Sequence, residues 1–113
     1  MVDGLAFFSS DDDYVQVGTW QYPAGKQLLA HTHNEVARSV LWTQEALLVR
    51  KGKIRASIYD THEVLVKEFV VSEGDIIILL RGGHGYEILE DNTQVLEIKN
   101  GPYVGADADR RRL

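Results

Sequence analysis

The sequence is divided by turn-forming residues into short segments in which apolar and polar residues alternate. The alternation is clearest over residues 15–20, 54–59 and 95–98, and a period of two residues is that of a half-buried strand. Clusters of Gly, Pro, Asn and Asp separate these segments at a spacing of mostly about ten residues. The pattern predicts an all-β fold in which an antiparallel sheet forms a sandwich or a barrel.

Residues 35–51 are the one segment that also suits a helix, because Val36, Val40 and Leu47 partly follow a helical period. The second half of this segment, however, runs from Glu45 directly into the turn Lys51-Gly52-Lys53 and a further strand. That arrangement is typical of a β-hairpin. We therefore predict a loop that is followed by a strand from about Glu45.

Length and composition indicate one globular domain over residues 1–113. A chain of 113 residues is long enough to bury a single core, and 44% hydrophobic and 26% charged residues are near globular averages. The longest apolar run, Ile76 to Leu80, is too short to cross a membrane. The N-terminus lacks the basic and then apolar order of a secretory signal, so we expect a cytoplasmic protein.

Charge and cysteine content narrow the possible partners and metal ligands. The net charge of −5 argues against nucleic acid, because the phosphate backbone attracts clustered Lys and Arg. The chain has no cysteine, so any metal ion must be held by nitrogen and oxygen atoms.

Two histidines, His31 and His33, are separated by one residue in "GKQLLAHTHN". On a strand they would share a face with their Cα atoms about 6.6 Å apart, and both imidazoles could come within about 2.1 Å of one ion. Two histidines on an exposed strand face are also common, so the pair alone leaves both interpretations open.

Two segments of the chain, the first of which contains this histidine pair, resemble the two motifs of the cupin superfamily. Gly25, followed after five residues by His31 and His33, is similar to the opening of the first motif, over about residues 25–52. "GDIIILLRGGHGYEILEDN", about residues 74–92, resembles the second motif, and residues 101–113 follow as a C-terminal tail. The resemblance implies a cupin-type antiparallel β-barrel (double-stranded β-helix, jelly roll) in which the metal ligands include His31, His33 and His84.

The carboxylate ligand that this family places after the histidine pair is displaced here. Ala37 and Arg38 stand at its usual positions, but the glutamate that is separated from Gly52 by six residues is Glu45. Glu35 is the alternative, since it would share a face with the histidine pair if the strand continued. His84 also lies one residue closer to the start of the second motif than is usual, a difference that the Gly82-Gly83 turn could absorb.

The resemblance implies one divalent transition-metal ion and a small-molecule ligand. Three histidines and a carboxylate suit Fe, Mn, Ni, Co or Zn without choosing among them. Three functions remain open: a metal-dependent oxygenase or isomerase, a non-catalytic module that binds a sugar or carboxylate, and a metal-free isomerase or epimerase. Arg38 is a candidate contact for an anionic group of the substrate. We also expect a homodimer, which would cover exposed edge strands.

Overall fold

The computed structural model describes residues 1–113 and is built from strands in three antiparallel sheets, with one short helix. The predicted all-β class is confirmed. Contacts divide the chain into two compact units, Met1–Leu41 and Trp42–Leu113. The expectation of one domain over residues 1–113 stays a prediction.

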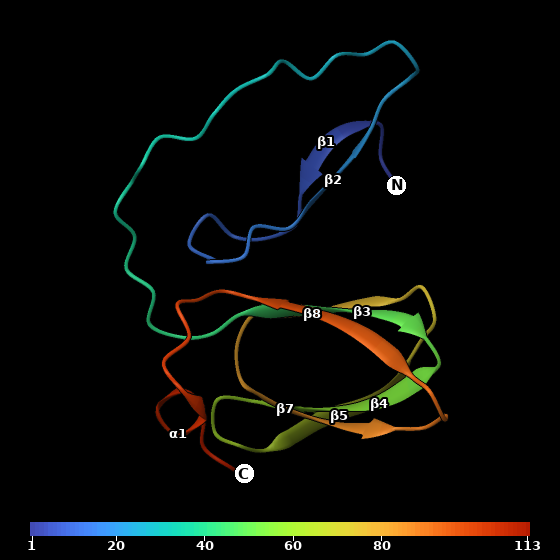
Figure 1. Ribbon diagram of the computed structural model, residues 1–113, viewed down its shortest axis with the longest axis vertical. Coiled ribbons are helices and arrows are strands. Elements are labelled where there is room, and N and C mark those ends of the chain that lie inside the picture. The colour runs from blue at the N-terminus through green and yellow to red at the C-terminus, as the bar shows by residue number, and fades with distance from the viewer. The chain divides into compact units, whose positions relative to one another are not determined.

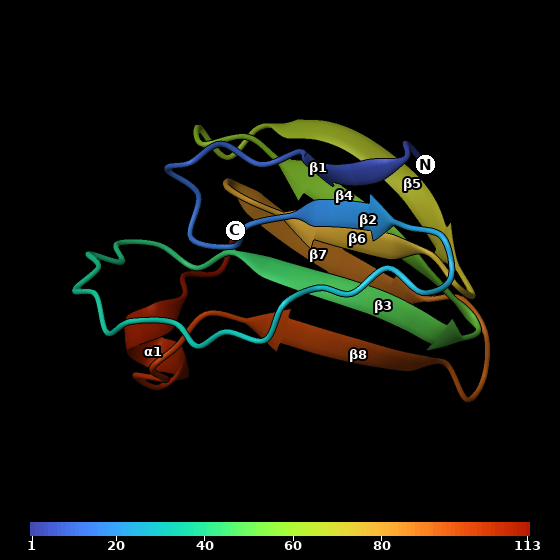
Figure 2. The same ribbon diagram turned by 90° about the horizontal axis from the view of Figure 1, so that it is seen from above.

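The second unit is a sandwich of two three-stranded sheets, which form the two layers in the lower part of Figure 1 and are seen from above in Figure 2. The first sheet has the order β6 (Ile76–Leu79), β3 (Glu45–Lys51), β8 (Gln94–Lys99). The second has the order β5 (Leu65–Ser72), β4 (Lys53–Tyr59), β7 (Gly83–Ile88). The strand pairing does not join these sheets into a closed barrel, so the finer expectation of a jelly roll is not confirmed.

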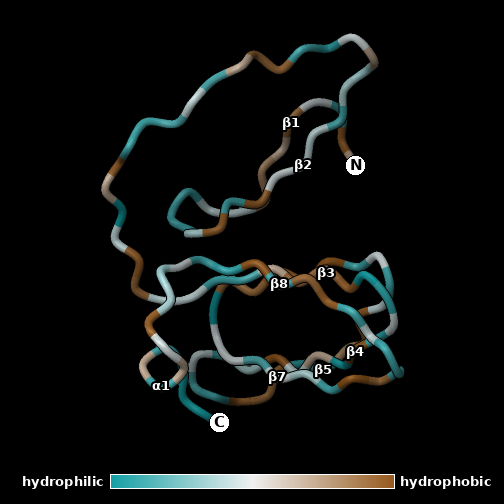
Figure 3. Tube along the Cα trace, in the orientation of Figure 1, coloured by the Kyte–Doolittle hydropathy of each residue, from teal (hydrophilic) through white to brown (hydrophobic).

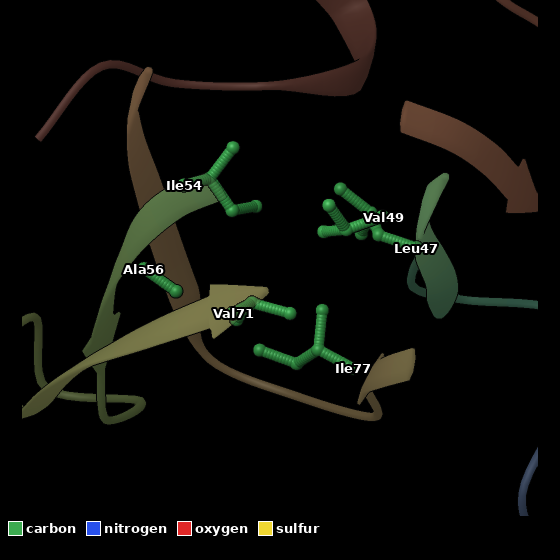
Figure 4. Close-up of a cluster of buried hydrophobic side chains, with 6 residues drawn as sticks. All are labelled: Leu47, Val49, Ile54, Ala56, Val71 and Ile77. Carbon is green, nitrogen blue, oxygen red and sulfur yellow. The ribbon is translucent and has the colours of Figure 1, made fainter. Parts of the chain in front are cut away.

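The core lies between the two sheets, and its buried side chains are all aliphatic. Alternate residues of β3 and β4 point into it, as the sequence pattern predicts. Figure 4 shows side chains of both sheets converging in one cluster. The buried members are Leu47, Val49 and Ile77 from the first sheet, and Ile54, Ala56 and Val71 from the second.

The predicted hairpin around Gly52 is wrong, because β3 and β4 belong to different sheets. Both edges of β3 are already occupied by β6 and β8, and both edges of β4 by β5 and β7. Gly52 has φ 87°, a conformation that glycine adopts without steric cost. The chain thereby leaves one sheet and enters the other. Figure 3 shows hydrophobic stretches within both sheets and hydrophilic colour at several of the turns between strands.

Three strand predictions for this unit are confirmed. The strand after the loop begins at Glu45, and the segments predicted over 54–59 and 95–98 lie within β4 and β8. In the tail, the short helix α1 (Ala106–Asp109) accepts a hydrogen bond of 3.1 Å from the Thr43 hydroxyl at Asp109. No helix in the structure has the length and apolar character needed to span a membrane.

The first unit contains the hairpin of β1 (Gly4–Phe7) and β2 (Gly18–Gln21) and then a long irregular segment. Residues 22–44 have no helix or strand, and residues 23–42 are all exposed. The expectation that His31 and His33 lie on a strand is therefore wrong. Their segment pairs with no neighbouring strand, and an extended segment without ladder hydrogen bonds is not a strand.

Substitution of Gly52 tests the turn through which the chain passes from the first sheet to the second. A Cβ at Gly52 would collide with the side chain of Thr93, whereas a Cβ at Gly74, which has the same φ of 87°, would meet nothing within 4 Å. Both Gly→Ala substitutions introduce backbone strain, but Gly52→Ala should lower the free energy of unfolding by about 1–3 kcal/mol more, because of overpacking. Urea unfolding of the two variants measures this difference, and equal losses would contradict the close contact with Thr93.

Candidate functional site

Two predicted site residues, Glu45 and His84, meet across the sandwich. His84 Nε2 lies 2.9 Å from Glu45 Oε1, within hydrogen-bonding distance. Glu45 is only 5% exposed, and the His84 side chain is 34% exposed. The carboxylate is thus buried against an imidazole that is itself partly accessible to solvent.

The strand register explains why these two side chains face each other. Glu45 continues the buried face of β3 by one further alternate position beyond Leu47. On the opposing sheet, His84 is the register partner of Ile58, which packs against the core. Directly opposed residues of an antiparallel pair point to the same side of the sheet. Both residues therefore point into the space between the sheets, at the end where β3 and β7 begin.

Three further polar residues surround this pair. Tyr86 is two residues from His84 on β7; its hydroxyl lies 3.4 Å from Glu45 Oε1, and its ring centroid is 5.3 Å from that of His84. Lys99 and Glu97 are the β8 register partners of Glu45 and Leu47, and they face the same interior. The Lys99 ammonium lies 3.9 Å from the Glu97 carboxylate. The polar cluster therefore draws on both sheets.

The surroundings stabilise the charged form of Glu45. The hydrogen bond with His84 is the largest influence and lowers the pKa of the Glu45 carboxyl, while burial acts in the opposite direction. The charge of His84, a hydrogen bond with Glu97 and the charge of Lys99 lower it further. Because an ionised carboxylate is costly to bury without partners, these contacts account for its position inside the sandwich.

The Tyr86 phenol is influenced in the opposite sense. Burial raises the pKa of Tyr86, and the nearby charges of Glu45 and Glu97 raise it further. The phenol consequently keeps its proton at neutral pH and can act as a hydrogen-bond donor toward the carboxylate.

The histidine pair of the first unit is exposed, and its two rings contact each other. The ring centroids of His31 and His33 are 5.1 Å apart, with an angle of 75° between the ring planes. His31 Nδ1 lies 3.0 Å from the carbonyl oxygen of Leu29. A hydrogen bond from Nδ1–H to this carbonyl would leave the lone pair on Nε2 available to a ligand.

The remaining predicted residues are not part of these two clusters. Within each unit, no three His, Cys, Asp or Glu side chains lie close enough together to hold a metal ion. The choice between Glu45 and Glu35 as the carboxylate ligand stays a prediction. Arg38 contacts the carbonyl of Val36 through Nη1, at 3.4 Å. The four-ligand set of His31, His33, Glu45 and His84 stays a prediction.

Tyr86, Glu97 and Lys99 were not among the ligands or substrate contacts predicted from the sequence. The alternation within β7 and β8 could have placed these side chains on an inner face. It could not have shown which strands pair or in which register, and that pairing is what brings them to Glu45.

Two surface hollows are lined by residues other than Glu45 and His84. One, of about 520 Å³, belongs to the first unit and is lined by Asp3, Gly4 and residues 21–23. The other, of about 390 Å³, lies along β5 and β6 in the second unit, where its lining is largely apolar. Neither hollow includes a predicted ligand.

Comparisons of this chain with protein-family models, with curated proteins and with solved structures found no match. The chemistry of the candidate site must therefore be argued from its own residues.

The contact between Glu45 and His84 predicts an energetic coupling in the metal-free protein. In a double-mutant cycle of Glu45→Gln and His84→Gln, the coupling in the free energy of unfolding should be about 0.5–3 kcal/mol, because the two groups share one network. Urea unfolding of the chelator-treated wild-type protein, the two single variants and the double variant measures this coupling.

The exposed ion pair of Arg55 and Glu87, with a 2.6 Å contact on the neighbouring strands β4 and β7, is the matched control. Its cycle should give about 0.2–1 kcal/mol, because solvent screens exposed pairs. A coupling for Glu45 and His84 no larger than that of the control would mean that burial does not strengthen their contact.

Proposed function

We propose that this chain is a cupin-type metal-binding protein. In this proposal His31, His33, Glu45 and His84 hold one divalent transition-metal ion, and a small molecule binds beside it. The observation that carries the proposal is the 2.9 Å contact of Glu45 with His84 across the sandwich. Two residues chosen for their place in two separate motifs are neighbours in space.

The donor chemistry fits such an ion. Neutral imidazole nitrogen and carboxylate oxygen are the usual ligands of Fe, Mn, Co, Ni and Zn where no thiolate is present. Glu45 is buried and its lowered pKa favours the charged form that a cation requires. The contact of His31 Nδ1 with the Leu29 carbonyl supports the tautomer whose Nε2 can ligate, an arrangement common among metal-binding histidines.

In this proposal the protein residues have separate tasks. Glu45 would supply the negative charge that a divalent ion needs, and His84 would supply the lone pair of one ring nitrogen. Such an ion, when bound, would supply Lewis acidity or a binding site for a small molecule. Such a site is compatible with a non-catalytic binding module and also with an oxygenase or isomerase.

The same contact supports a second candidate function without a metal. A histidine that is hydrogen-bonded to a buried carboxylate is the usual form of an oriented general base. In this alternative His84 would accept a proton from a small-molecule substrate, as in an isomerase or epimerase, and Glu45 would hold the imidazole in place. Metal content separates the two candidates.

The metal-binding proposal predicts that protein purified without chelators, and without a histidine tag, contains close to one transition-metal ion per chain. Elemental analysis of the purified protein measures this ratio, and titration of chelator-treated protein with Zn²⁺ or Co²⁺ measures uptake. Protein that contains no metal and takes up none would rule out the metal site and favour the acid–base alternative.

The proposal also distinguishes the two glutamates. Glu45→Gln replaces the ligand carboxylate with an amide of the same shape and should weaken metal binding strongly. Glu35→Gln is the matched control: Glu35 is exposed, and the change should leave binding nearly unaltered. Competition with a chromophoric chelator measures both affinities, and the reverse result would identify Glu35 as the ligand.

A further inference from the structure

We propose that Tyr86 is a positioning residue of the metal site, acting on two proposed ligands at once. Its hydroxyl lies against the carboxylate of Glu45, and its ring lies against the imidazole of His84. The inference rests on the proposed metal-binding function and adds a residue that neither motif contains as a ligand.

The position of Tyr86 follows from the alternation of β7. His84 and Tyr86 are two residues apart on this strand, and their register partners Ile58 and Ala56 face the core. Both side chains therefore point between the sheets, and their ring centroids are 5.3 Å apart. The tyrosine ring limits how the imidazole can turn, because it lies beside that ring on the same inner face.

The hydroxyl has a defined chemical role toward the carboxylate. An ionised carboxylate only accepts hydrogen bonds, so the phenol O–H must be the donor in its 3.4 Å contact with Glu45 Oε1. His84 Nε2 contacts the same oxygen at 2.9 Å. A metal ion bound by His84 would use the lone pair of one of its ring nitrogens. The hydrogen bond from Tyr86 goes to Glu45 and does not involve that lone pair.

Tyr86 is therefore suited to orient Glu45 while His84 serves as a ligand. Partners that hydrogen-bond to metal ligands fix the ligand orientation, and their loss typically lowers metal affinity by about 10–100-fold. Removal of the Tyr86 hydroxyl still leaves the buried Glu45 carboxylate in contact with His84 Nε2, at 2.9 Å.

The test compares Tyr86→Phe with Tyr59→Phe, using Co²⁺ as the probe. Tyr59 follows Ile58 on β4, so alternation places it on the outer face of the sheet. Tyr59→Phe therefore removes the same phenol oxygen from a side chain that does not face the site. Tyr86→Phe should lower the Co²⁺ affinity by about 10-fold or more and change the Co²⁺ absorption spectrum. Tyr59→Phe should match the wild-type protein in both measurements.

A second cycle shows whether Tyr86 acts through Glu45. In a Glu45→Gln background, Tyr86→Phe should lower the Co²⁺ affinity much less than in the wild-type background. Urea unfolding of the metal-free variants separates site effects from folding effects. If Tyr86→Phe lowers the free energy of unfolding of the metal-free protein enough to explain its whole loss of Co²⁺ affinity, Tyr86 is a structural residue and the inference is overturned.

The possible failures are distinguishable. If the wild-type protein takes up no Co²⁺, the proposed function fails, and the inference fails with it. If the wild-type protein binds Co²⁺ and Tyr86→Phe has the same affinity and spectrum, the metal site stands and only the positioning role of Tyr86 is refuted.

Discussion

Apolar packing between the two sheets of the second unit is the constraint on which its other features depend. Val49 on one sheet and Ile54 on the other are almost completely buried in this layer. The same alternation that buries Val49 also turns Glu45 inward, where burial of a carboxylate is costly unless charged or hydrogen-bonding groups offset it. His84 and Tyr86 on the opposing sheet are those groups, so the core and the candidate site result from a single register.

The sequence predicted the features of the fold that depend on neighbouring residues. The period of two residues identified the strands within 53–59 and 94–99, and the strand start at Glu45 was correct. The supposed hairpin at Gly52 was wrong because the choice of strand partners depends on edges supplied by distant segments. The histidine segment was wrongly expected to be a strand for the same reason, since alternation does not supply a ladder partner.

The candidate site was predictable to a similar extent. Motif spacing selected Glu45 and His84, and the structure brings the two together; the joint role of these residues with His31 and His33 remains a proposal. Glu97 and Lys99 could not be found, because they reach Glu45 through the register of β8 on β3. A one-residue slip in that register would turn both side chains away from the site.

The passage of the chain from one sheet to the other at Gly52 has a consequence for folding. β4 and β5 are consecutive strands and pair locally, whereas β3 pairs with β8 across most of the unit, and non-local pairing is slow to form. Glu45 belongs to the first sheet and His84 to the second. An intermediate with only one sheet formed would contain the carboxylate or the imidazole in place, but not their contact, so any ligand that needs both would select the completely folded sandwich.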